Sequence, residues 1–306
     1  MRLSSPVSRR HCLGLLAALP WATLPARPAH SRTAEVLVAR TPAPNPVTAR
    51  FATYTHALLE LAFAETAEFG PSRVDLDERS LERRRVEAEL DRGDRISVFL
   101  MPGTNAYDRR FLRISLPVDR GLMGFRIGQI RRADTGRFSA IRSVDDLRQI
   151  RIGSVLGWYM SDILHHNGLT VDVLPTAGDL YPMLQRGRID MILRGATDIQ
   201  QEQVNIAADM PDIGIEESLL VHLPVAQYLY VSREQPALYH RLETGLRRAV
   251  DSGRFDSLFY GYYGPPLESL TVSGRTRIDL TDPDPHGPTA NAPPGLLLSL
   301  PSLPAR

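Results

Sequence analysis

The sequence predicts an α/β protein built from two similar strand–helix units in series, and two observations favour this class. Short apolar runs of strand length alternate with amphipathic stretches of helix length, which is the order of a parallel sheet with crossover helices. The tetrapeptides Leu-Asp-Arg-Gly at 90–93 and Leu-Gln-Arg-Gly at 184–187 each lead into an apolar strand, about 94 residues apart. With 306 residues, the chain is long enough for two domains of about 150 residues each.

The first unit is expected to contain two strands and two helices. Residues 35–39 (Glu-Val-Leu-Val-Ala) form a short apolar run before a turn-rich stretch, which is typical of a buried strand. A helix is predicted over 53–67, because apolar residues recur there at three- and four-residue steps. A second helix ends at Gly93, and the chain returns as a strand over 96–101.

The second unit repeats this plan. Residues 150–155 are typical of a strand, and Ser143 and Asp146 before them have the spacing of a helix capping box. A helix is expected over 161–166, and the matching second strand over 189–193.

Two stretches outside the repeated units are expected to connect them, namely 113–130 and 219–231. The second is apolar and too long for one strand of a compact domain, so we expect it to cross between two lobes and then join a sheet. Helices expected over 241–252 and 256–263 would return the chain to the first lobe.

The first 31 residues have the order of a signal peptide: arginines, an apolar run from Cys12 to Leu24, then small residues and prolines. The stretch Ser8–Leu13 resembles the twin-arginine export motif, so we expect export to the periplasm. The apolar run is shorter than the roughly 20 residues that span a membrane. Cys12 is the single cysteine, so the exported chain would hold no disulfide and no thiolate site.

The other end, residues 265–306, contains nine of the 24 prolines. Because proline disfavours regular helices and central strands, an extended tail that lies on the body is expected there. A tail that docks on a partner through Leu296–Leu300 is the alternative.

Composition excludes several classes of function. The formal net charge of +1 and the absence of long single-sign runs give no electrostatic reason to expect nucleic acid as a partner. The chain has no lysine, which excludes a Walker phosphate loop and pyridoxal or aldolase-type catalysis. No cofactor motif and no metal-ligand spacing is present, so we expect no cofactor and no metal.

The order of elements resembles the type II periplasmic solute-binding proteins, in particular the family 3, polar amino-acid type receptors of ABC transporters. Four stretches carry the resemblance: 90–101, 108–117, 143–163 and 184–194. It implies a two-lobed fold with mixed, mostly parallel sheets flanked by helices and two hinge crossings. Lobe I would comprise 32–119 with 222–264 and lobe II 120–221, between the signal peptide 1–31 and the tail 265–306.

The resemblance also implies site residues. Arg109 or Arg110 stands where the family clamps the ligand carboxylate, whereas Arg194 stands where the family has an acid that binds the ligand ammonium. Trp158 and Tyr159 replace the usual small hydroxyl residues. Ordinary α-amino acids are therefore disfavoured as ligands.

A cleft between Arg110 and Arg194 would offer guanidinium forks from both lobes to an anionic ligand. Trp158 with Tyr159 would form a flat wall, and Thr104 with Asn105 would donate hydrogen bonds. Asp198 would neutralise Arg194 or bind ligand hydroxyls, and Arg40 would point into the cleft. Each of these residues has a structural alternative: a surface arginine, an internal ion pair of Arg194 with Asp198 or Asp190, or a packing residue.

We therefore expect an exported, monomeric solute-binding protein that captures a small anionic ligand for an ABC-type transporter or a sensor and has no catalytic activity. One alternative is a non-transporting protein that keeps the fold and binds a partner. The other is a hydrolase with its active site in the cleft.

Overall fold

A computed structural model describes residues 35–298 except 45–48, 80, 82, 270–273, 285 and 294. The described residues all belong to one compact unit. The predicted signal peptide lies outside the described residues. No described helix combines the length and the apolar character that crossing a membrane requires.

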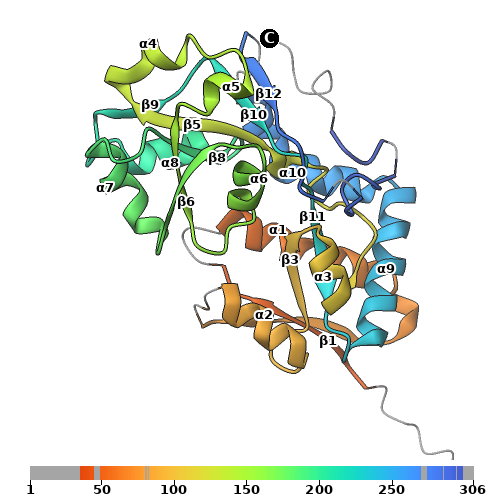
Figure 1. The fold of residues 1–306 in the computed structure, drawn as a ribbon. Helices are drawn as coiled ribbons and strands as arrows, with labels where there is room; N and C mark the ends of the chain where they lie inside the picture. The colour runs from red at the N-terminus through yellow and green to blue at the C-terminus, as the bar shows by residue number, and fades with distance from the viewer. Residues whose placement is uncertain are drawn as a thin grey trace, which may run out of the picture. The chain divides into compact units, whose positions relative to one another are not determined.

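Within the described residues, five strands make up the sheets of the part that we call the first lobe. Strands β1 (Leu37–Pro42) and β2 (Ser72–Asp77) pair in parallel. Strand β11 (Gln227–Val231) lies between β3 (Val98–Pro102) and β4 (Leu112–Arg113) and is antiparallel to both. Their core is covered by the long helices α1 (Ala49–Ala64), α9 (Pro236–Asp251) and α10 (Arg254–Ser269) (Figure 1).

A mixed sheet, with seven strands in the part of the chain that the structure describes, makes up what we call the second lobe. Its order is β12-β10-β5-β8-β6-β7, with β9 paired to β5 (Figure 1). Strand β6 is parallel to β7 and β8, whereas β5 is antiparallel to β8, β9 and β10. The strands are β5 (Phe125–Arg131), β6 (Arg151–Val155), β7 (Thr170–Leu174), β8 (Met191–Gly195), β9 (Ile213–Ile215), β10 (Leu219–His222) and β12 (Thr276–Asp279).

Shorter helices complete both lobes. They are α2 (Arg83–Arg92), α3 (Asn105–Arg110), α4 (Thr135–Phe138), α5 (Val144–Leu147), α6 (Met160–His166), α7 (Leu180–Gln185) and α8 (Ile199–Ile206), with 3-10 turns at Ala67–Phe69, Leu122–Gly124, Arg132–Asp134 and Ala177–Asp179. The predicted capping box is confirmed: Ser143 accepts the backbone N–H of Asp146 at 3.2 Å, and Asp146 in turn binds the N–H of Ser143 at 3.1 Å.

One close approach positions α9 against α1. A Cβ atom at Gly245 would lie 2.2 Å from the carbonyl oxygen of Ala62, which is far inside van der Waals contact. The two helices can therefore pack at this distance only because residue 245 has no side chain.

The two predicted hinge crossings run from β4 to β5 and from β10 to β11. Asp119 ties them together, because its Oδ1 accepts the N–H of Gly121 at 3.0 Å and of Gln227 at 2.8 Å, while its Oδ2 accepts that of Met123 at 3.0 Å. The carboxylate is 2% exposed, and this burial raises its pKa to about 6.

The expectation of an extended tail from residue 265 is wrong in two places. Helix α10 continues through Pro265 and Pro266 to Ser269, where Leu267 is buried in the first-lobe core. Strand β12 then pairs in parallel with β10 of the second lobe, so the chain crosses between the lobes a third time. A strand is possible because 276–279 contains no proline and lies at the sheet edge, where one side of the backbone needs no partner.

Candidate functional site

Asn105, at the start of α3, presents two hydrogen-bond donors, and one carboxylate takes both. The backbone N–H of Asn105 donates to Oδ2 of Asp284 at 3.2 Å, and the side-chain Nδ2 donates to Oδ1 at 2.7 Å. Thr104 is buried and caps the helix, since its Oγ1 accepts the backbone N–H of Tyr107 at 3.1 Å. Of the two predicted donors, Asn105 therefore faces an acid and Thr104 holds the helix.

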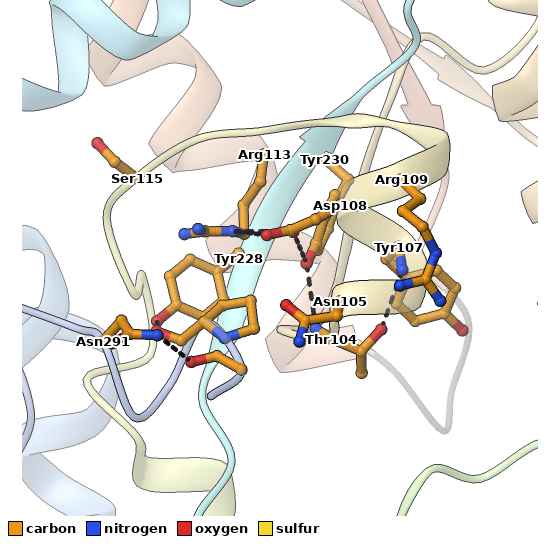
Figure 2. Close-up of polar contacts among 12 residues, drawn as sticks. Thr104, Asn105, Tyr107, Asp108, Arg109, Arg113, Ser115, Tyr228, Tyr230 and Asn291 are labelled. Atoms are coloured by element: carbon orange, nitrogen blue, oxygen red, sulfur yellow. Dashed lines mark hydrogen bonds and ion pairs between the residues drawn. The ribbon is translucent and has the colours of Figure 1, made fainter. Parts of the chain in front are cut away.

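Asp108 of α3 is the centre of a network that we call the Asp108 network. Figure 2 shows Arg113 and Tyr230 both directed at its carboxylate. The Nε of Arg113 donates to the two oxygens at 2.9 and 3.1 Å, and the hydroxyl of Tyr230 donates at 2.9 Å. The guanidinium of Arg113 also lies 4.8 Å from the ring centroid of Tyr228, whose pKa burial raises to about 12. Asp108 is thus neutralised within its own lobe.

Arg110, one of the two arginines at the family's carboxylate-clamping position, is paired on the surface. It donates to Glu87 at 3.0 Å and to Asp91 at 2.7 Å, both on α2, and its side chain is 42% exposed. The side chain of Arg109 points away from the Asp108 network (Figure 2). In this conformation Arg110 is therefore a surface arginine, which is the structural alternative that the sequence left open.

Tyr159 precedes α6 of the second lobe and also binds a carboxylate. Its hydroxyl donates to Oδ1 of Asp282 at 3.1 Å, and burial together with the negative charge of Asp282 raises the pKa of Tyr159 well above its ordinary value. The neighbouring Trp158 is half-buried and packs against both apolar clusters of the second lobe. The tyrosine is therefore a neutral donor at this face.

Arg194 of β8 is held by an acid from α8. Its Nε and Nη2 each donate to one oxygen of Glu202 at 2.5 Å, and its guanidinium lies 5.4 Å from the ring centroid of Trp158. Burial lowers the pKa of Arg194, but the hydrogen bonds to Glu202 outweigh this effect and leave the pKa raised. The structural alternative for Arg194 was an internal ion pair with Asp198 or Asp190. Arg194 does form an internal ion pair, but its partner is Glu202.

Asp198 faces the first lobe. The Nη1 of Arg50 in α1 lies 3.7 Å from Oδ1 of Asp198 and donates to the carbonyl oxygen of Thr197 at 2.9 Å. Burial raises the pKa of Asp198, an effect that Arg50 opposes. This contact joins the two lobes directly through charged groups.

Arg126 is a further charged residue of this cluster that the sequence did not single out. It lies in β5 opposite Gly195 of β8, and its Nε is buried without a hydrogen-bond partner among the described residues. Burial, and then repulsion by Arg194, lower its pKa to about 10. The signal that could have identified it is a lone arginine inside the otherwise uncharged run Phe125–Ile130.

Arg40 lies apart from these groups. It is a half-buried residue of β1, in register with Asp75 of β2, and its backbone N–H donates to Oγ of Ser97 at 2.8 Å. The contacts of the described residues place it with β2 and β3 in the first lobe.

The structure thus sorts the predicted residues into three sets. Asn105 and Tyr159, from different lobes, meet the residues that follow β12. Trp158, Arg194 and Asp198 lie in a second-lobe cluster with Arg126, and the remaining arginines lie elsewhere. Within the described ranges, no three or more His, Cys, Asp or Glu side chains are grouped so that they could hold a metal ion.

Comparison with known proteins identifies the fold. No protein-family model and no curated protein matches the chain. The GluR0 ligand-binding core from Nostoc punctiforme in complex with L-glutamate is 15% identical, with a TM-score of 0.50, over 75% of this chain and 99% of that one. The substrate-binding protein of an amino acid ABC transporter is 15% identical over 75% and 100% of the two chains, with a TM-score of 0.49.

The substrate-binding protein AbpA from Streptococcus pneumoniae, bound to L-arginine, is 15% identical over 76% and 95% of the two chains, with a TM-score of 0.48. At these identities, the similarity to the GluR0 core concerns the fold alone. It confirms the predicted α/β, two-lobed type II periplasmic-binding-protein fold.

Proposed function

We propose that this chain is a solute-binding protein that takes a small, carboxylate-bearing solute between its two lobes and does not transform it. The observation that carries the proposal is that a donor from each lobe already holds a carboxylate. Asn105 of the first lobe binds Asp284 through two hydrogen bonds, and Tyr159 of the second lobe binds Asp282. A solute with two carboxylates would satisfy both donors.

A buried positive charge in the second-lobe cluster with Trp158, Arg194 and Asp198 supports the same class of ligand. Arg126 is a cation whose Nε lacks a partner among the described residues, and its low pKa reflects an environment that disfavours its charge. An added anion would relieve that cost, because charge-assisted hydrogen bonds are about twice as strong as neutral ones. Arg110 and Arg194 would contribute only after leaving Glu87, Asp91 and Glu202.

The proposal includes the biological setting that the sequence predicts. An exported, monomeric receptor in the periplasm would deliver its solute to an ABC-type permease or to a sensor. Binding would be coupled to lobe closure, because a ligand that contacts both lobes favours the state in which both are in reach.

A second candidate function is supported by one observation. The donors described above are occupied by the chain's own residues, as expected of a protein that keeps the fold but binds a protein partner instead of a solute. If the experiment below shows no solute-dependent change, the result favours this partner-binding function.

Tryptophan fluorescence provides the test. The two tryptophans are Trp21 and Trp158, so the full chain carrying Trp21→Phe reports only from Trp158, next to Tyr159. Titration with succinate should give a saturable change in emission. Succinate at about 100 times its dissociation constant should also stabilise the fold by about 2.7 kcal/mol in thermal unfolding.

Succinamide is the matched control, because it has the same carbon skeleton without the charges. We expect it to change neither signal. If succinate and succinamide act alike, the site does not select carboxylates. If neither acts on this protein or on the variant described next, the solute-binding proposal is wrong.

A further inference from the structure

The described part of residues 281–298, which we call the C-terminal segment, extends across both lobes. On the second lobe it continues from β12, where Leu280 donates its N–H to His222 at 2.9 Å. Thr281 then binds Asn167 through its backbone on both sides: its N–H donates to Oδ1 at 2.9 Å, and its carbonyl oxygen accepts from Nδ2 at 2.8 Å. The segment is thereby fixed beside α6 before it reaches Tyr159.

On the first lobe, the C-terminal segment packs at very short range. The hydroxyl of Tyr228 donates to the carbonyl oxygen of Pro288 at 3.1 Å, and the N–H of Ala226 donates to Oγ1 of Thr289 at 3.0 Å. A Cβ at Gly103 would lie 2.6 Å from the Tyr228 ring and 3.0 Å from Cβ of Pro288. This fit requires glycine at residue 103.

The end of the C-terminal segment is anchored by apolar side chains. Leu296 and Leu298 pack against the first-lobe core, and Leu297 packs against the cluster that contains Tyr228. The N–H of Leu298 donates to the carbonyl oxygen of Arg120 at 2.8 Å, close to the hinge. Both ends of the segment are therefore held, and the acids lie between them.

We propose that the C-terminal segment is a built-in competitor for the site between the lobes, with Asp284 and Asp282 in the places of a solute's carboxylates. This inference rests on the proposed function. The Nδ2 of Asn105 and the hydroxyl of Tyr159 each have one proton directed at these acids, so a solute can take the same bonds only when the segment leaves. A tethered competitor acts at an effective concentration on the order of millimolar. The apparent affinity for a solute equals its intrinsic affinity multiplied by the fraction of molecules in which the site is free.

The test compares the full chain with the variant Asp282→Asn plus Asp284→Asn, both carrying Trp21→Phe. The substitutions keep the shape and remove the charges that compete with a carboxylate. Asp279→Asn is the matched control, because Asp279 precedes the C-terminal segment, in β12, but binds Arg277 and His222. We expect succinate to bind the double variant at least tenfold more tightly than the wild-type chain, and the Asp279→Asn control like the wild type.

Hydrogen–deuterium exchange gives a second readout that needs no solute. The amide of Asn105 should exchange at least tenfold faster in the double variant, and saturating succinate should restore its protection. Equal succinate affinities in the two proteins would overturn the inference and leave the solute-binding proposal intact.

If succinate binds to neither protein, the proposed function is wrong, and exchange alone decides whether the segment covers the site. Faster exchange at Asn105 in the variant supports the cover, and unchanged exchange overturns it. Each single variant, Asp282→Asn and Asp284→Asn, serves if the double variant does not fold.

Discussion

The substitution Asp119→Asn should change how stability depends on pH. Burial raises the pKa of Asp119 from the ordinary 3.8 to about 6, so between these values the folded protein holds a proton that the unfolded chain has released. Folding is therefore favoured at low pH, and this contribution is lost as the pH rises through the window. A difference of about two pKa units, at about 1.36 kcal/mol per unit, corresponds to about 3 kcal/mol.

The assay is urea unfolding of the wild-type chain and of Asp119→Asn at intervals from pH 3.5 to pH 7.5. The free energy of unfolding of the wild type minus that of the variant should fall by about 3 kcal/mol across the range, most of it between pH 4 and pH 6. Asp251→Asn, which removes an exposed carboxylate of α9, should differ from the wild type by no more than about 0.5 kcal/mol throughout. A difference for Asp119→Asn that is flat, or that grows with pH, would refute the reasoning.

Three further predictions concern other parts of the molecule. Gly245→Ala should destabilise the fold by about 1–3 kcal/mol in urea unfolding because of the clash with α1, whereas Gly261→Ala, which meets nothing within 4 Å in α10, should stabilise it by about 0.5–1 kcal/mol. Arg126→Met should raise the free energy of unfolding by about 1 kcal/mol, because it removes a buried donor that has no partner among the described residues. It should also weaken succinate binding. A loss of stability with unchanged succinate binding would contradict both expectations. Arg194→Ala should cost about 3 kcal/mol because it leaves Glu202 partly buried and unpaired, whereas Arg110→Ala should cost less than about 1 kcal/mol as an exposed pair.

Features set by neighbours in sequence were predictable. The capping box of Ser143 and Asp146 depends on a three-residue spacing, and the echo at Gly93 and Gly187 marks two positions where the chain adopts positive φ angles of 73° and 66°. Glycine tolerates this conformation because it has no Cβ. Such features depend on residues that are close together in the sequence, so one sequence is enough to predict them.

The ion-pair partners of the arginines could not be predicted in this way. Glu87 is 23 residues from Arg110, and the fold alone decides that they meet. An arginine beside a ligand and an arginine beside a distant acid have the same local sequence. The acids of the C-terminal segment were missed for the same reason, since Asp284 and Asn105 are 179 residues apart.

The position of β12 has a consequence for how the chain is made. Strand β10, which β12 completes, is synthesised more than 50 residues earlier, and so its outer edge stays unpaired until the last part of the chain is available. The first lobe likewise remains incomplete until β11, α9 and α10 have been synthesised. Neither half can finish folding until these late elements have been synthesised. A chain that ends before Thr276 exposes an open sheet edge, and such edges recruit other chains.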